Sequence, residues 1–402
     1  MEDKKKSDLT NVLFVLQNRM DGSAYSEKIP QIDNSWAVQI TDNSEEAKEL
    51  LRSQAFDVLI CDDELSNDSG ISVIESCRQV RPSCLGFLRK KSQPSNEESL
   101  ALSQKKIFYL PGNLEEEGIY SHISRRILLR SLSENPNLLS VIRRMKKMPT
   151  IPQLYHQITR ELHKEDGSIE FVAGLISKEP SMSTRILKAV NSPVYGLGYE
   201  ITEVVHALLF LGKDATQAQI LADSVFSSYP SDSIAGIELQ KIWKHSINVS
   251  AIARHISLQI ETNKKASEIA CTAGVIHDLG KVLMAANLPD HYAQAVKLAK
   301  DEDVPLVQAE QKVFGTNHAE VAASLMGLWA IPFKILNSVA YHHNPVGGPK
   351  SPPIATMALY MANGIDNAKS QTPLGQKYSE EMIDQWGFAN EFTDWVEEFN
   401  SR

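Results

Sequence analysis

The chain has 402 residues, with 41 Lys and Arg against 50 Asp and Glu, so its formal net charge is −9. At roughly 100–200 residues per domain, this length predicts two or three domains. The part up to residue 133 and the remainder are both net acidic. A nucleic-acid partner is therefore not expected, because such proteins carry a broad basic surface.

Four cysteines, Cys61, Cys77, Cys84 and Cys271, form no CxxC pair, which is typical of a reducing compartment. The apolar run 12–16 is too short for a secretory signal. No run approaches the ~20 apolar residues that a membrane span requires. We therefore expect a cytoplasmic protein without a membrane partner.

In residues 1–133, short apolar runs alternate with amphipathic stretches. Such alternation predicts a parallel sheet covered on both faces by helices, and hence an α/β domain. The runs typical of buried strands are 12–16, 56–61, 85–88 and 107–110, and the stretches typical of helices are 44–53 and 70–80.

In residues 134–402 the pattern changes, because apolar residues now recur every three or four positions. One such stripe contains Met182, Ile186 and Val190, and it begins after Pro180, which suits the first position of a helix. Ser, Asn and Pro gather at 131–136, where we place the domain boundary. The second domain is therefore predicted to be all-helical.

Several residues of the first domain carry a family resemblance. The segment Phe56–Asp62, followed by Gly70, resembles the third strand and loop of a response-regulator receiver domain, and Leu13–Val15 resembles its first strand. The resemblance covers about residues 10–130 and implies a flavodoxin-like sheet of strand order 2-1-3-4-5. In receivers an Asp after the third strand accepts phosphate, and Asp62 matches that position.

The resemblance also implies groups that this chain lacks. Leu16 and Gln17 occupy the places of the acidic pair that holds Mg²⁺ in receivers, and Leu110 replaces the lysine after the fifth strand. The hydroxyl position after the fourth strand falls near Arg89. We therefore expect that Asp62 is not phosphorylated, and that the domain is a degenerate receiver used for dimerisation or partner docking.

The second domain is rich in histidine, with seven of the eleven histidines between His245 and His343. Adjacent His and Asp can supply a nitrogen and an oxygen to one metal, and histidines of other helices can add ligands. A bound metal could lower the pKa of water and produce a nucleophile. The alternative, that each histidine is an ordinary core or helix-end residue, stays open. The candidate ligands are His245, His277, Asp278, His318 and His342.

The same half carries a second family resemblance, spread over separate motifs that occur in the same order. Together they resemble the HDOD domain, an all-helical relative of the HD-type metal phosphohydrolases, over about residues 138–345. HDOD domains resemble signalling modules, and a receiver-like domain before one resembles bacterial signal-transduction proteins. The motifs are 148–153, 176–180, 189–196, 201–202, 207–212 and the histidine segments.

This resemblance implies roles for particular residues. His245, His277 and Asp278 match three metal ligands of the HD hydrolases, while Asn363 stands in the place of the fourth, an Asp. Lys281 matches a lysine that is common after the His-Asp pair, so Asp278 and Lys281 are the candidate catalytic residues.

Two further histidines, His318 and His342, resemble extra ligands of the HD-GYP cyclic-di-GMP phosphodiesterases. The rest of that signature is missing after His343. A divalent metal (Mn, Fe, Zn or Mg) is the one cofactor that the resemblance implies.

Three functions stay open at this point. The first is a non-enzymatic regulator that relays a signal to a protein partner, with a homodimer as one form of assembly. The second is a metal-dependent phosphohydrolase acting on a nucleotide or cyclic nucleotide. The third is a domain that binds a nucleotide ligand without turnover. Two degenerate sites in one chain favour the first.

Overall fold

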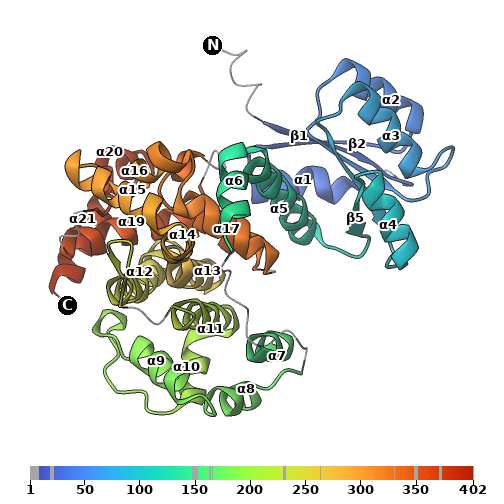
Figure 1. Cartoon of the computed structure of the whole chain (residues 1–402). Helices are drawn as coiled ribbons and strands as arrows, with labels where there is room; N and C mark the ends of the chain where they lie inside the picture. The colour runs from blue at the N-terminus through green and yellow to red at the C-terminus, as the bar shows by residue number, and fades with distance from the viewer. Residues whose placement is uncertain are drawn as a thin grey trace. The chain divides into compact units, whose positions relative to one another are not determined.

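The computed structural model describes residues 9–18, 22–146, 153–162, 164, 166–229, 232–262, 264–329, 331–347, 352–370 and 374–401. The motif at 148–153 lies, except for Gln153, outside the described residues. The chain divides into two compact units, of which the first ends at Ile127 and the second begins at Leu128. Figure 1 shows the sheet in the first unit and helices throughout the second.

The first unit contains a five-stranded parallel sheet of order β2-β1-β3-β4-β5. This order is the one that the receiver resemblance implied, so the predicted α/β flavodoxin-like fold is confirmed. The strands are β1 (Thr10–Val15), β2 (Trp36–Thr41), β3 (Val58–Asp62), β4 (Leu85–Lys90) and β5 (Phe108–Pro111).

Four helices connect these strands, and a fifth, α5, follows β5. The helix predicted at 44–53 begins after Asn43, whose side chain accepts hydrogen bonds from the backbone N–H groups of Glu45 and Glu46. The central strands β1 and β3 are buried along almost their whole length, as expected of strands that are covered on both faces. The helices are α1 (Ser23–Ile32), α2 (Ser44–Ser53), α3 (Gly70–Val80), α4 (Asn96–Gln104) and α5 (Glu116–Glu134).

The second unit is helical apart from a hairpin of two short strands, so the predicted all-helical class is confirmed for the described residues. From α6 to α11 its helices are α6 (Pro136–Arg144), α7 (Gln153–Leu162), α8 (Ile169–Ile176), α9 (Pro180–Val190), η3 (Pro193–Tyr195), α10 (Val204–Leu211) and α11 (Lys213–Ser227). The hairpin is β6 (Ser233–Ile234) and β7 (Ile237–Glu238).

The later helices form the part of the unit that carries the histidines. Helix α12 packs against both α13 and α19, and α17 packs against α14 and α18. These helices are α12 (Leu239–Ile260), α13 (Lys264–Ile276), α14 (Leu279–Asn287), α15 (Pro289–Asp301), α16 (Leu306–Phe314), α17 (His318–Leu328), α18 (Phe333–Tyr341), η4 (Pro345–Gly347), α19 (Ile354–Lys369), α20 (Glu380–Gln385) and α21 (Ala389–Ser401).

Two glycines allow the helices around the histidines to approach closely. A Cβ atom at Gly274 would lie 2.5 Å from Ser250 Cα on α12, and a Cβ atom at Gly280 would lie 2.0 Å from the carbonyl oxygen of His318. A side chain at either position would therefore force the neighbouring helix away. These contacts bring α13 and α14 against the elements that carry the other histidines.

One segment of the described chain, Lys264–Asn287, is long and apolar enough to cross a membrane by length and composition. From the sequence we expected no such segment. Most of it, 83%, is buried inside the protein, as in the core helix of a globular domain. The structure breaks it at Ile276, where α13 ends, and α14 begins at Leu279.

Candidate metal centre

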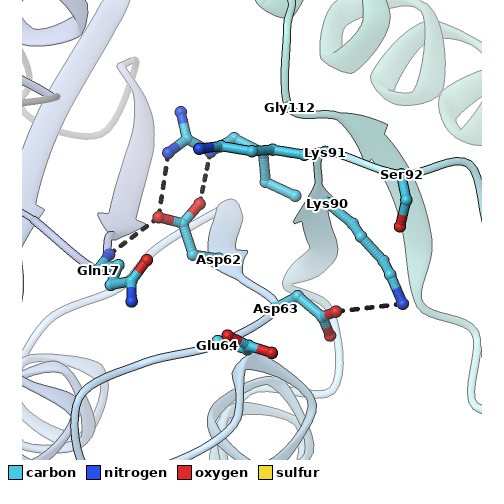
Figure 2. Close-up of a pocket in the computed structure, with 9 residues that line it drawn as sticks. Gln17, Asp62, Asp63, Glu64, Lys90, Lys91, Ser92 and Gly112 are labelled. Carbon is cyan, nitrogen blue, oxygen red and sulfur yellow. Dashed lines mark hydrogen bonds and ion pairs between the residues drawn. The ribbon is translucent and has the colours of Figure 1, made fainter.

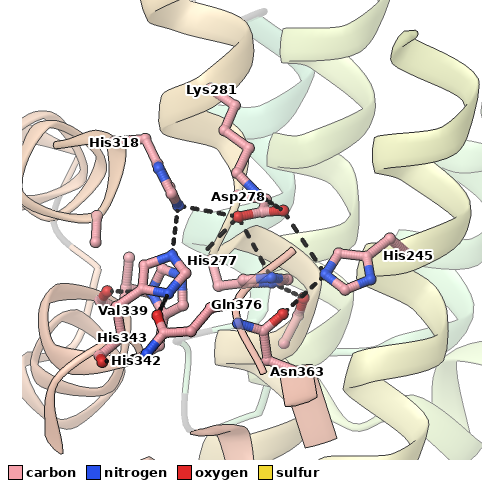
Figure 3. Close-up of polar contacts among 12 residues, drawn as sticks. His245, His277, Asp278, Lys281, His318, Val339, His342, His343, Asn363 and Gln376 are labelled. Carbon is pink, nitrogen blue, oxygen red and sulfur yellow. Dashed lines mark hydrogen bonds and ion pairs between the residues drawn. The ribbon is translucent and has the colours of Figure 1, made fainter. Parts of the chain in front are cut away.

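Five histidines and one aspartate converge in the second unit (Figure 3). They include all five ligands predicted from the sequence, and also His343. His245 comes from α12, His277 and Asp278 from the junction of α13 and α14, His318 from the first position of α17, and His342 and His343 from the residues after α18.

Local structure places most of the histidines near the ends of helices. Asn317 caps α17, because its side chain accepts hydrogen bonds from the N–H groups of Ala319 and Glu320. This cap places His318 in the first turn. His342 lies directly after the last residue of α18, at the C-cap position. Apart from His245, which lies inside α12, the site is therefore assembled from the points where helices begin and end.

Each of the five rings contacts an oxygen atom through Nδ1. Two of these oxygens are backbone carbonyls, which can only accept, so His277 and His342 carry their proton on Nδ1 and expose a lone pair on Nε2. Histidines that bind metals are held in the same way. The contacts are His245 to Asp366 Oδ2 (2.6 Å), His277 to Gly274 O (2.8 Å), His318 to Glu310 Oε2 (2.6 Å), His342 to Val339 O (2.7 Å) and His343 to Gln376 Oε1 (2.5 Å).

Three buried polar atoms at the centre of this group have no hydrogen-bond partner among the described residues: His277 Nε2, His342 Nε2 and Asp278 Oδ1. Asp278 Oδ1 lies 3.2 Å from His318 Nε2, in an ion pair if that ring is protonated, 3.4 Å from His277 Nε2 and 3.9 Å from His342 Nε2. A buried acceptor without a partner costs about 1–3 kcal/mol. A cation bound among these atoms would remove that cost, so the residues present fit a metal ion.

Two pairs of acceptors face each other at hydrogen-bond distance. His318 Nε2 lies 2.9 Å from His343 Nε2, and His245 Nε2 lies 3.0 Å from Asn363 Oδ1. A neutral imidazole donates from one nitrogen only, and the Nδ1 atoms of these rings already face oxygens. A proton or a cation must therefore lie between the atoms of each pair.

The cluster contains two sets of ligand atoms, each within 4.8 Å of one another. The first set, here called subsite A, is His245, His277 and Asp278. The second, subsite B, is Asp278, His318, His342 and His343. Asp278 belongs to both, and its Oδ2 atom accepts a hydrogen bond of 2.7 Å from Lys281 Nζ.

The protonation states suit metal binding. Burial lowers the pKa of His277 to about 4, and burial also lowers the pKa values of His342 and His343 well below the usual range. Burial opposes the charge of Asp278, but His277 and Lys281 outweigh it and hold the pKa of this carboxyl well below its usual value. Near pH 7 these three imidazoles are therefore neutral and Asp278 is ionised. At His318 burial opposes the charge, but Glu310 and Asp278 outweigh it and raise the pKa of this imidazole.

Some functional residues were not found from the sequence. Asp366 and Glu310 anchor His245 and His318, and Gln376 anchors His343. The His342-His343 dipeptide was a signal for His343. Asn363 was predicted to replace the fourth ligand, and its Oδ1 atom does contact His245 Nε2. The same Oδ1 atom accepts a hydrogen bond from Asn367 Nδ2.

In the first unit Asp62 lies at the end of β3, beside a cavity of about 380 Å³ (Figure 2). Arg89 on β4 donates to both carboxylate oxygens, at 2.5 Å from Nε and 3.0 Å from Nη2, and the N–H of Gln17 donates to Oδ2. The neighbouring Asp63 forms an ion pair with Lys90. Each acidic side chain is thus neutralised by a cation of β4.

The family model of the HDOD domain matches residues 148–345. A curated relative, an uncharacterized protein of Treponema pallidum (strain Nichols), is 24% identical over 228 residues, which cover 55% of this chain and 42% of the relative. The matching part thus spans less than half the length of that relative.

Two solved structures share the fold. An HDOD domain protein of unknown function from Geobacter sulfurreducens has a TM-score of 0.52 at 24% identity, over 66% of this chain and 93% of that one. A candidate signal transduction protein from Marinobacter aquaeolei VT8 has a TM-score of 0.51 at 15% identity, over 80% of this chain and 78% of that one. At these identities the likeness concerns the fold alone.

Proposed function

Residues 148–345 of this chain form an HDOD domain, and on that premise we propose that the protein is a bacterial signal-transduction regulator that acts through a protein partner and not by catalysis. The observation that carries the proposal is the two-point contact between Arg89 and Asp62. The first unit has a receiver-like strand order, but this contact already neutralises the carboxylate at the acceptor position.

The contact with Arg89 opposes phosphorylation of Asp62. A paired guanidinium and carboxylate form strong charge-assisted hydrogen bonds, which an incoming phosphoryl group would have to break. Mg²⁺ would normally compensate the added charge, but Gln17 contributes only its backbone N–H here. The first unit is therefore a pseudo-receiver, whose use is to dock a partner.

In the HDOD domain, subsites A and B would hold a divalent metal. A set of imidazoles with one carboxylate suits Mn²⁺, Fe²⁺ or Zn²⁺, whereas Mg²⁺ prefers oxygen ligands. Because the ligands come from α12, α17 and the ends of α13 and α18, a bound metal would cross-link these elements through coordination bonds. In a regulator this would fix the arrangement of helices that a partner recognises.

A turnover assay tests this proposal. The full chain, loaded in turn with Mn²⁺, Fe²⁺ and Zn²⁺, is incubated with a panel of cyclic nucleotides and nucleoside phosphates. We expect turnover at background with every metal. Turnover above background that disappears in Asp278→Ala would contradict the regulator and establish an enzyme.

A second candidate function, an HD-type metal-dependent phosphohydrolase, is favoured by the unpartnered atoms of His277, His342 and Asp278. A metal held there would supply a bound water of lowered pKa. Lys281 and His245 keep 18% and 13% of their side chains exposed, so a phosphate group would approach from their side. Lys281 would then hold the phosphate charge and keep Asp278 oriented.

Asn363 weighs against this second candidate. An amide oxygen is neutral and binds a divalent cation more weakly than the carboxylate that HD hydrolases place there. Its Oδ1 atom also accepts a hydrogen bond from Asn367, which uses part of its capacity as a ligand. Turnover is therefore the less supported of the two functions.

A further inference from the structure

Gln376 reaches the metal centre from a segment that follows the matched HDOD region. It lies between α19 and α20, about thirty residues past the end of the match at residue 345. Its Oε1 atom lies 2.5 Å from His343 Nδ1, and its Nε2 atom donates to the carbonyl oxygen of His343 at 3.0 Å. Figure 3 shows Gln376 beside His343 within the cluster.

The segment around Gln376 is held in place on both sides. Asn367 Nδ2 donates to the carbonyl oxygen of Gln376, and the carbonyl of Leu374 accepts from the N–H of Leu306. Ser379 N–H donates to the hydroxyl of Tyr360. Since Leu306 begins α16 and Tyr360 lies on α19, the segment is tied to two different helices of the unit.

The chain beyond Gln376 provides further anchorage. Phe392, Trp395 and Phe399 of α21 are buried, and Lys369 Nζ at the end of α19 donates to the carbonyl oxygen of Phe399. Helix α21 packs against α19. The position of Gln376 is therefore set by a folded C-terminal extension, which starts at the segment after α19 and ends with α21.

The two contacts of Gln376 determine which nitrogen of His343 is free. Because the amide nitrogen donates to a carbonyl, the other amide atom must be the oxygen, and His343 Nδ1 must donate to it. The Nε2 atom of His343 is then left with its lone pair and faces His318 Nε2 at 2.9 Å. Gln376 thus presents His343 in the form that a metal ligand requires.

We propose that the C-terminal extension completes a second metal position, subsite B, in which Gln376 is the positioning residue that presents His343 as a ligand. This inference rests on the metal centre of the proposed function. Subsite A does not contain His343, and its two histidines are anchored by Asp366 and Gly274. Loss of Gln376 should consequently weaken one metal position and spare the other.

Metal titration of the full chain tests this. Metal-free protein is titrated with Co²⁺ and Zn²⁺, and bound metal per chain is determined by mass spectrometry. We expect two equivalents for the wild type. In Gln376→Ala one equivalent should lose about 10–100-fold in affinity, the usual effect of removing a residue that orients a ligand, while the other is unchanged.

Three variants make the comparison specific. Gln376→Glu keeps an oxygen that accepts from His343 Nδ1, so it should retain both equivalents. Gln376→Leu keeps the volume of the side chain without its polar atoms, so it should lose the same affinity as Gln376→Ala. It replaces the alanine variant in the comparison if that variant does not fold. Gln311→Ala, at an exposed position on α16, is the matched control and should match the wild type.

A second readout separates positioning from a general structural effect. Nitrogen-15 NMR of the metal-free protein should report His343 protonated at Nδ1 in the wild type and in Gln376→Glu, and a mixture of tautomers in Gln376→Leu. Two equivalents of unchanged affinity in Gln376→Leu would overturn the role of Gln376. One equivalent in the wild type would overturn subsite B alone, whereas no bound metal at all would overturn the metal centre itself.

Discussion

His318 Nε2 and His343 Nε2 lie 2.9 Å apart, although each ring already contacts an oxygen through its Nδ1 atom. Two neutral imidazoles held in this way would direct lone pairs at each other. The two Nε2 atoms and Asp278 Oδ1, which has no hydrogen-bond partner among the described residues, therefore form a set of ligand atoms arranged around a positive charge.

Asp278 is the residue shared by both subsites, so its removal should have the largest effect on metal content. We expect Asp278→Ala to lose all bound metal, because each subsite would be left with histidines alone. Metal per chain after reconstitution and dialysis measures this. The matched control is Asp290→Ala, an exposed aspartate of α15, which should bind as the wild type. Full retention of metal in Asp278→Ala would refute the shared role.

Glu310 should matter through His318. It is fully buried, accepts from both the N–H and Nδ1 of His318, and accepts from the hydroxyl of Tyr292. Glu310→Gln keeps the shape but loses the charge that holds the proton on Nδ1. We expect the affinity of subsite B to fall about 10–100-fold, measured by Co²⁺ titration.

The control for Glu310 is Glu381→Gln on the exposed side of α20. That substitution removes the same charge at an exposed position and should leave both equivalents unchanged. Equal affinities in Glu310→Gln and Glu381→Gln would show that the buried carboxylate does not orient the ligand.

Glycine 280 allows α17 to approach α14, so Gly280→Ala should displace His318. Its Cβ atom would lie 2.0 Å from a backbone oxygen, and overpacking of this kind costs about 1–3 kcal/mol. The same substitution at Gly174 on α8 meets no atom within 4 Å. Alanine favours helix by roughly 0.8–1.0 kcal/mol over glycine, so Gly174→Ala should stabilise. Urea unfolding should show that the free energy of unfolding falls in Gly280→Ala and rises in Gly174→Ala. Changes of the same sign in both variants would contradict this packing account.

Arg89 should stabilise the first unit and prevent its modification. Arg89→Ala leaves the largely buried carboxylate of Asp62 without its main partner, and we expect a loss of about 1–3 kcal/mol in the free energy of unfolding.

Acetyl phosphate should label neither the wild type nor Asp62→Asn, as checked by intact mass. Stoichiometric labelling of the wild type that is absent in Asp62→Asn would contradict the pseudo-receiver.

Much of the fold could be predicted because four of its five strands read as short continuous apolar runs, of which β1 and β3 are the most buried. β1, β3, β4 and β5 were found in this way. β2 was missed, since Trp36–Thr41 is only partly buried and mixes polar with apolar residues. α1 was missed as well, because Pro30 lies inside the helix and proline normally argues against one.

Five of the six ligands of the site could be named from the sequence, because they lie in motifs that resemble those of a known family, but His343 and the residues that orient the ligands could not. His245 contacts Asp366 across 121 positions of the chain, and His343 contacts Gln376 across 33. No local pattern marks such partners. Arg89 is similar, because its contact with Asp62 depends on the register of β3 against β4, which places the two residues opposite each other.

Metal content is the measurement that most directly tests the central claim, which is that the histidine cluster of the second unit binds a metal. The full chain is purified without chelators or a histidine tag, and metal per chain is determined by inductively coupled plasma mass spectrometry before and after reconstitution with Mn²⁺, Fe²⁺ and Zn²⁺. The account predicts at least one equivalent, lost in His277→Ala. A wild-type protein that holds no metal even after reconstitution would contradict it.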